Sequence, residues 1–213
     1  MKIGILGSGD VGRTLGAGLA TRGHDVKVGT RSPEKEAIRD WGTKSGPRTS
    51  VGTFADAASF GELAIVATRW DGTENALKLA GPSNLEGKVV IDATNPLTMN
   101  GGELGLALGF SDSGGEQVQR WLPGAKVVKV YNTVGHAHMV DPKFPGGQPD
   151  MFLCGDDDDA KKTVGEITRS FGWGVIDCGG IDKSRLLEPL CILWVDYGIK
   201  TGTWNHAYKL LRK

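Results

Sequence analysis

The feature that most constrains the fold is a glycine-rich turn within the first dozen residues. An apolar run over residues 2–6 leads directly into Gly7, Ser8, Gly9, Asp10, Val11 and Gly12. Leu15 and Leu19 follow at helical spacing, which predicts a strand, a tight turn and a helix in succession. In a dinucleotide fingerprint the three glycines permit the turn, the approach of a pyrophosphate and close packing of the helix. The segment therefore predicts a dinucleotide site, and a glycine turn without a ligand is the alternative.

The end of the second expected strand indicates which nicotinamide cofactor is preferred. A site that prefers NAD usually carries Asp or Glu there, on the ribose hydroxyls. This chain instead has Thr30, Arg31 and Ser32, with Lys35 one turn later. A guanidinium can form paired hydrogen bonds with a phosphate, and hydroxyls can donate further bonds. The segment therefore predicts NADP(H), although Glu34 argues against it and a solvated basic loop is the alternative.

Short apolar runs alternate with helical patterns along the rest of the chain. The continuous apolar run over residues 63–67 is typical of a buried parallel strand. Further strands are expected over residues 24–29, 51–53, 89–93, 126–131, 151–155 and 173–178, and helices over 36–41, 54–60, 71–79, 114–122, 160–171 and 184–199. This order predicts an α/β fold of Rossmann type with a doubly wound, mainly parallel sheet. One domain over residues 1–213 is expected, with residues 184–213 as a short C-terminal helical extension.

Polar residues that follow the expected strands are candidates for the site, because ligands of such sheets bind at the carboxyl ends of the strands. Thr68 and Trp70 follow one strand, and Thr94 and Asn95 follow the next. His136 leaves the end of a third and, with His138, is the best titratable candidate, although an exposed loop histidine is the alternative.

Residues 97–113 form a long glycine-rich stretch with no clear periodicity. Loops of this length in a compact domain are usually functional or mobile. We expect a flap that covers the cofactor, and an unstructured insertion is the alternative.

Composition argues against several function classes. The chain has 25 basic and 25 acidic residues, so nothing suggests nucleic acid or an anionic membrane as a partner. No stretch reaches ~18 apolar residues, and no signal-peptide layout is present at the start. Three cysteines without metal spacing indicate free thiols and a cytoplasmic protein: Cys154, Cys178 and Cys191.

No metal site is expected. The aspartates at 156–159 precede a helical pattern and are interpreted as its N-cap and first turn, where acids are favoured by the helix dipole. His136 and His138 lack further close ligands.

The segment over residues 184–199 is apolar around most of its helical circumference. Such a helix is buried on more than one side, either in a core or at a subunit interface. We therefore expect a homodimer. Pro189 is expected to start a turn or to kink this helix.

Further motifs occur in register with the first one. They are residues 29–31 (Gly-Thr-Arg), 92–97 (Asp-Ala-Thr-Asn-Pro-Leu), 129–135 (Lys-Val-Tyr-Asn-Thr-Val-Gly), 154–157 (Cys-Gly-Asp-Asp) and 184–188 (Ser-Arg-Leu-Leu-Glu). With these motifs the chain resembles, over nearly its whole length, the deazaflavin (coenzyme F420)-dependent NADP oxidoreductase family. It also resembles the cytosolic reductase domain of the STEAP metalloreductases.

The resemblance implies an oxidoreductase that transfers a hydride between NADP(H) and a flavin or deazaflavin acceptor. It places residues 8–12 on the pyrophosphate, and Thr30, Arg31 and Lys35 on the 2′-phosphate. It places Trp70, Asn95 and His136 on the nicotinamide side. The acceptor side is assigned to Asn132, Thr133, Val134 and Gly135.

Two departures from the archaeal pattern fall on the acceptor side. Arg69 stands where that pattern has Pro, and residues 132–135 stand where it has His-Thr-Ile-Pro. The ring that accepts the hydride therefore stays open among deazaflavin, FMN, FAD and riboflavin.

Two other functions use the same fingerprint. An NADP(H) sensor would bind the cofactor without turnover. Reductases of small imine or carbonyl substrates add a helical domain of some size, whereas only residues 184–213 follow the last expected strand here.

Overall fold

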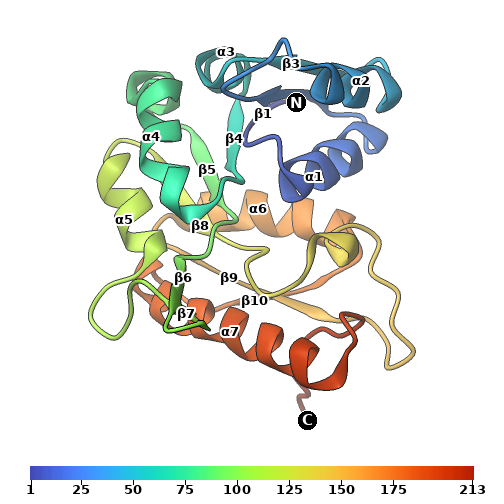
Figure 1. The fold of residues 1–213 in the computed structure, drawn as a ribbon, viewed down its shortest axis with the longest axis vertical. Coiled ribbons are helices and arrows are strands. Elements are labelled where there is room, and N and C mark those ends of the chain that lie inside the picture. The colour runs from blue at the N-terminus through green and yellow to red at the C-terminus, as the bar shows by residue number, and fades with distance from the viewer.

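The structure is built on one eight-stranded sheet in the order β10-β9-β8-β5-β4-β1-β2-β3 (Figure 1). The computed structural model describes residues 1–213, apart from the side chain of Asn100. The six strands from β3 to β8 in this order are parallel, whereas β9 pairs antiparallel with β8 and parallel with β10. The strands are β1 (Lys2–Leu6), β2 (Asp25–Gly29), β3 (Thr49–Gly52), β4 (Leu63–Val66), β5 (Val89–Asp92), β8 (Lys126–Lys129), β9 (Asp150–Gly155) and β10 (Gly174–Asp177). The expected Rossmann-type, mainly parallel sheet is confirmed.

Helices cover both faces of this sheet. One buried cluster joins the sheet to α1 (Asp10–Thr21), α2 (Glu36–Lys44) and α6 (Asp158–Ser170). A second cluster on the other face joins it to α3 (Phe54–Phe60), α4 (Trp70–Ala80), α5 (Gly114–Trp121) and α7 (Ser184–Thr201). Short 3-10 turns are η1 (Pro82–Leu85), η2 (His136–His138) and η3 (Ile181–Lys183). In Figure 1, α4 and α5 lie on one side of the strands while α1 and α6 lie on the other. The strands are therefore buried from both sides, which explains their continuous apolar runs.

Several helix boundaries differ from those expected. The helix α2 continues through Gly42, beyond its expected end at residue 41. A Cβ at Gly42 would lie only 3.1 Å from Val51, so the glycine allows the helix to pack closely on β3. The helix α4 begins at Trp70, one residue before the expected start at 71, so Asp71 lies in its first turn. The helix α7 is continuous through Pro189, so the expected new turn does not occur there. The N-cap predicted within the aspartates is confirmed, because Asp157 accepts a hydrogen bond from Ala160 N at 2.8 Å.

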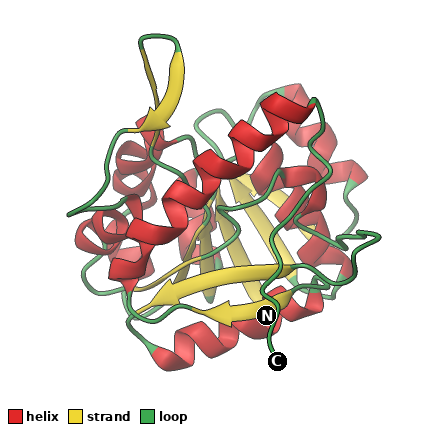
Figure 2. Ribbon diagram, turned by 90° about the horizontal axis from the view of Figure 1, so that it is seen from below, coloured by secondary structure: helices red, strands yellow, loops and turns green.

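The expected flap contains a β-hairpin. Strands β6 (Leu97–Asn100) and β7 (Glu103–Leu106) pair antiparallel, with Gly101 and Gly102 between them. Both glycines have positive φ, 61° and 95°, as a two-residue hairpin turn requires. The hairpin stands away from the body of the molecule (Figure 2). The alternative of an unstructured insertion is therefore wrong for residues 97–106, and covering of the cofactor by a flap stays a prediction.

The helix α7 is buried along one face only. Its buried residues include Leu187, Cys191 and Trp194, whereas Leu186, Leu193 and Tyr197 are at least half exposed. Burial around the whole circumference is thus not reached within one chain. Neither α7 nor another helix of the described residues has both the length and the apolarity to cross a membrane.

The C-terminal residues after α7 return along the outer part of the sheet. Asp150 N, at the start of β9, donates to Tyr208 O at 2.9 Å. Leu210 N donates to the Asp150 carboxylate at 2.8 Å. The Tyr208 hydroxyl donates to Leu190 O of α7 at 2.8 Å, so the tail connects the helix to the sheet edge.

Candidate cofactor-binding site

The glycines of the fingerprint turn have separate structural tasks. Gly7 has φ 134°, and its N–H donates to Gly29 O at 3.1 Å. A Cβ at Gly7 would lie 2.3 Å from Ala67 O, and one at Gly12 would lie 2.0 Å from Gly7 O. A Cβ at Gly9 would meet nothing within 4 Å. The first and third glycines are therefore required by packing, whereas the second borders open space.

That open space faces the start of α1. Gly9 is the N-cap of α1 and provides no side-chain hydrogen bond to the first turn. The helices α3, α5 and α6 have such caps, from Thr53, Ser113 and Asp157. Uncapped amides at a helix start carry partial positive charge and bind anions. The turn therefore fits a pyrophosphate, which needs both the free amides and the room beside Gly9.

A cleft of about 650 Å³ extends from this turn across the carboxyl ends of β1 and β4. The strand order changes direction between these two strands, which is where open α/β sheets bind their ligands. The expected site residues that line the cleft are residues 7–11, Thr30, Arg31, Thr68 and His136. The fingerprint, the basic segment and the candidate histidine thus share one cleft.

Further residues line the cleft beyond those that the sequence assigned to the cofactor. Most come from α4 and the residue before it, namely Arg69, Asp71, Gly72, Asn75 and Ala76, and Phe54 of α3 joins them. The helix α4 starts directly after β4, so its first turns must lie at the carboxyl edge of the sheet. The strand at 63–67 together with the position of the helix start could have identified this wall.

The basic end of the cleft has one side chain without an internal partner. The Thr30 hydroxyl accepts from Ser8 Oγ at 3.2 Å and from Ser32 N at 3.4 Å, which holds the turn. Arg31 is exposed and has no hydrogen bond or ion pair within the described part of the chain. Lys35 is the N-cap of α2 and, like Ser32, does not line the cleft. The Arg31 guanidinium is therefore available to a phosphate.

Thr94, Asn95 and Asn132 do not line the cleft. The buried Thr94 hydroxyl donates to Asp92 Oδ1 at 2.7 Å. Asn95 Nδ2 donates to Asn132 O at 2.9 Å, and Asn132 Nδ2 donates to Leu187 O at 2.8 Å. Among the described residues, the buried Asn132 Oδ1 accepts no hydrogen bond. These side chains hold the ends of β5 and β8 against α7.

Trp70 and residues 133–135 are also outside the cleft lining. The Trp70 ring stacks on Trp121 with 5.5 Å between centroids. Thr133 and Val134 are buried, and a Cβ at Gly135 would lie 2.8 Å from the Trp194 ring. Of the residues expected on the nicotinamide and acceptor sides, His136 alone lines the cleft in the described structure, and Thr68, a strand-end candidate, lines it as well.

A buried ionic cluster joins the ends of β5 and β8 to α7, and we did not expect it from the sequence. Lys129 Nζ lies 2.7 Å from Asp92 Oδ2, 3.2 Å from Glu188 Oε1 and 2.9 Å from Thr94 O. Burial lowers the pKa of Lys129, but the two carboxylates outweigh it and raise that pKa overall, so the ammonium stays charged. Lys129, which lies between the apolar pairs 127–128 and 130–131, was the available signal.

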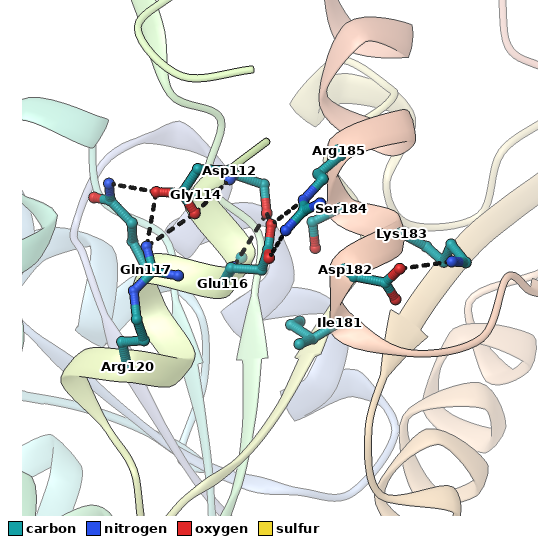
Figure 3. Close-up of polar contacts among 12 residues, drawn as sticks. Asp112, Gly114, Glu116, Gln117, Arg120, Ile181, Asp182, Lys183, Ser184 and Arg185 are labelled. Atoms are coloured by element: carbon teal, nitrogen blue, oxygen red, sulfur yellow. Dashed lines mark hydrogen bonds and ion pairs between the residues drawn. The ribbon is translucent and has the colours of Figure 1, made fainter. Parts of the chain in front are cut away.

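The same cluster fixes α7 against α5. Both Glu188 carboxylate oxygens accept from the first amides of α5, those of Gly114 and Gly115, at 3.0 Å. Figure 3 shows the neighbouring ion pair, in which Arg185 of α7 reaches Glu116 of α5. The hydrogen bond from Arg185 lowers the pKa of the Glu116 carboxyl. Two charged contacts therefore set the position of α7.

The cleft is poor in groups for acid–base chemistry. His136 is its one histidine among the described residues, and Asp10 and Asp71 are exposed carboxylates. Within the described residues, no three His, Cys, Asp or Glu side chains are grouped so that they could hold a metal ion. The arrangement is suited to positioning bound molecules rather than to proton transfer between paired side chains.

Comparisons with known proteins agree with this geometry. Residues 2–96 match the family model described as NADP oxidoreductase, coenzyme F420-dependent. The chain is 31% identical over 191 residues to the rat metalloreductase STEAP3, which covers 89% of this chain and 36% of that protein. A crystal structure from Arthrobacter sp. FB24, assigned as an F420-dependent NADP reductase, superimposes with a TM-score of 0.94 at 39% identity over 100% of both chains.

One archaeal relative matches over nearly its full length. The chain is 32% identical over 214 residues to the F420-dependent NADP reductase of Methanocaldococcus jannaschii, covering 94% of this chain and 93% of that protein. The identity, the coverage and the shared fold lead to one assignment: this chain belongs to the F420-dependent NADP oxidoreductase family.

Proposed function

We propose that this oxidoreductase transfers a hydride between NADP(H) and a flavin or deazaflavin acceptor. The observation that carries the proposal is the cleft itself, where uncapped amides of α1, open space beside Gly9 and the free Arg31 guanidinium occur together. Relatives whose names state F420-dependent NADP reduction support the acceptor class. When bound, NADPH supplies two electrons and one proton as a hydride to the acceptor ring and becomes NADP⁺, while a second proton comes from solvent.

We assign the cofactor groups to the residues as follows. Residues 8–12 bind the pyrophosphate through backbone amides. Arg31 binds the 2′-phosphate, with Thr30, Ser32 and Lys35 around it. Thr68 and His136 lie beside the nicotinamide. We assign no direct cofactor contact to Trp70, Thr94, Asn95 and residues 132–135, because they do not line the cleft.

The chain's own contribution to the reaction is position and the exclusion of water. Hydride transfer needs the donor and acceptor carbons about 3–3.5 Å apart and aligned. The buried contacts among Asp92, Lys129 and Glu188 hold the ends of β5 and β8 against α7. Closure over a planar ring would shield the reaction. The hairpin at residues 97–106 contributes no described side chain to the cleft lining, so its role as a flap requires movement.

The reaction is tested by mixing the protein anaerobically with NADPH and one acceptor at a time. We expect loss of reduced-nicotinamide absorbance with F420, FMN, FAD or riboflavin, and the acceptor that turns over fastest names the substrate class. Tight NADPH binding without turnover of these acceptors would instead support an NADP(H) sensor. Turnover of a cyclic imine or a ketone, without turnover of these acceptors, would support a reductase of small imine or carbonyl substrates.

Arg31→Asp is expected to weaken NADPH binding about 100-fold, because it removes a charge-assisted bond and adds repulsion. NADH binding should change little, since NADH has no 2′-phosphate. Dissociation constants from nicotinamide fluorescence measure both effects. Arg39→Asp makes the same charge change on exposed α2 outside the cleft and should leave both constants unaltered. Equal affinities for NADPH and NADH in the unmutated protein would contradict the assignment.

We also propose a homodimer that forms through the exposed face of α7. Leu186, Leu193 and Tyr197 are half or more exposed and recur at helical spacing on one side of this helix. Leu193→Glu should convert a dimer into a monomer, because it places a charge within the apolar stripe. Light scattering at micromolar concentration measures the mass. Leu79→Glu, an equally exposed leucine on α4, is the matched control and should remain dimeric.

The same proposal covers domain organisation and location. We infer one domain over residues 1–213 with a helical extension at 184–213, supported by the packing of α7 on α5.

We infer a cytoplasmic protein that acts on small molecules, supported by three free cysteines and a net charge of zero. Burial raises the pKa of the Cys154 thiol to about 12, which keeps it protonated and unreactive.

A further inference from the structure

We propose that Arg69 selects a hydride acceptor that carries a phosphate on the side chain of its ring. FMN is then preferred over riboflavin, although both have the same isoalloxazine ring. The proposal rests on the hydride transfer described above and names the substrate class within it.

The position of Arg69 places its charge on the β4 side of the cleft, to which we assign the nicotinamide. Arg69 is the N-cap residue of α4, directly after β4, and it lines the cleft. Arg31 follows β2, and the sheet order places β2 and β4 on opposite sides of β1. The cleft therefore has one arginine on each side of the fingerprint turn.

The Arg69 side chain is not committed to another task. It is 90% exposed, and its ion-pair partner among the described residues is Asp71 at 3.5 Å, itself 72% exposed. An exposed pair at this distance contributes little, so it can exchange for a better anion. A guanidinium offers paired donors that match phosphate oxygens.

The anions of NADP(H) are already assigned elsewhere in the cleft. The pyrophosphate lies at the amides of α1, and the 2′-phosphate lies on the β2 side at Arg31. The nicotinamide end carries no phosphate, yet the acceptor ring must lie against it for the hydride to move. A phosphate on the side chain of that ring is the anion left for Arg69. Asp10 and Asp71 would otherwise repel it from the cleft.

The experiment compares FMN with riboflavin at saturating NADPH. The unmutated protein should show the higher kcat/KM with FMN. Arg69→Ala should lower kcat/KM for FMN about tenfold, the effect of losing one charge-assisted hydrogen bond in a partly solvated site. The value for riboflavin should not change. Arg69→Lys should retain part of the preference, and added salt should reduce it.

Two further variants sharpen the comparison. Lys78→Ala removes a positive charge from the same helix outside the cleft lining and should leave the FMN preference intact. Asp71→Asn removes the present partner of Arg69 together with a negative charge from the cleft, and it should increase the preference for FMN.

Binding is measured alongside turnover, by flavin fluorescence with the NADP⁺-loaded protein. An unchanged FMN to riboflavin ratio in Arg69→Ala overturns the proposal. Weaker NADPH binding with that ratio unchanged also overturns it, and assigns Arg69 to the cofactor. If neither flavin turns over, the proposed reaction fails, while tighter binding of FMN that depends on Arg69 would still support this inference.

Discussion

Gly9→Ala is expected to abolish NADPH binding, with at least a 100-fold rise in the dissociation constant, while the protein stays folded. The backbone at Gly9 has φ −74° and ψ −177°, which alanine adopts without strain. Its Cβ would meet no protein atom within 4 Å, so the fold has room for it. The same methyl group occupies the space where the pyrophosphate approaches the amides of α1. Nicotinamide fluorescence measures the binding, and circular dichroism measures the thermal midpoint.

Two other glycines provide the controls. Gly146→Ala also adds a Cβ in open space, outside the cleft lining, and should change neither binding nor midpoint. Gly12→Ala places a Cβ 2.0 Å from Gly7 O and should destabilise the whole protein. Unaltered NADPH affinity in Gly9→Ala would remove the fingerprint turn as the pyrophosphate site.

Lys129→Met is expected to lower the free energy of unfolding by about 3–5 kcal/mol, the usual effect of removing one partner of a buried ion pair. The change leaves Asp92 and Glu188 buried without their counter-ion. Urea unfolding with an unchanged m-value measures the loss. Lys78→Met breaks an exposed pair with Glu74 on α4 and should cost under about 1 kcal/mol.

The double variant Lys129→Met/Asp92→Asn separates charge from packing, because Asp92 Oδ1 accepts from Thr94 and Oδ2 has Lys129 as its partner. It removes one of the two carboxylates that lost their partner, so it should regain part of the stability that Lys129→Met loses. Equal stability of Lys129→Met and Lys78→Met would show that the cluster is not important for the fold.

The fold was predictable where the signal is local. The apolar run at residues 63–67 became β4, and the fingerprint became the turn between β1 and α1. The hairpin at residues 97–106 was missed because its strands have four residues each, too few to show alternation. The pair Gly101–Gly102 was the available turn signal.

The candidate site was predictable on its phosphate side and less so on its acceptor side. Backbone amides and the exposed Arg31 take their positions from neighbouring residues in the chain. The direction of Trp70 depends instead on where α4 begins and on Trp121, which is 51 positions away. Lys129 likewise meets Glu188 only through tertiary packing. Contacts of this kind cannot be predicted from residue type and spacing.

The contact between Gly135 and Trp194 has a consequence for how such sequences diverge. A Cβ at position 135 would lie 2.8 Å from the indole of Trp194, so this loop and α7 cannot both carry large groups here. The archaeal pattern has Pro at the position of Gly135. Substitutions at positions 135 and 194 are therefore expected to occur together. A homologue with Pro at position 135 should carry a residue smaller than Trp at position 194. An alignment of many family members would show this pair as a covarying one.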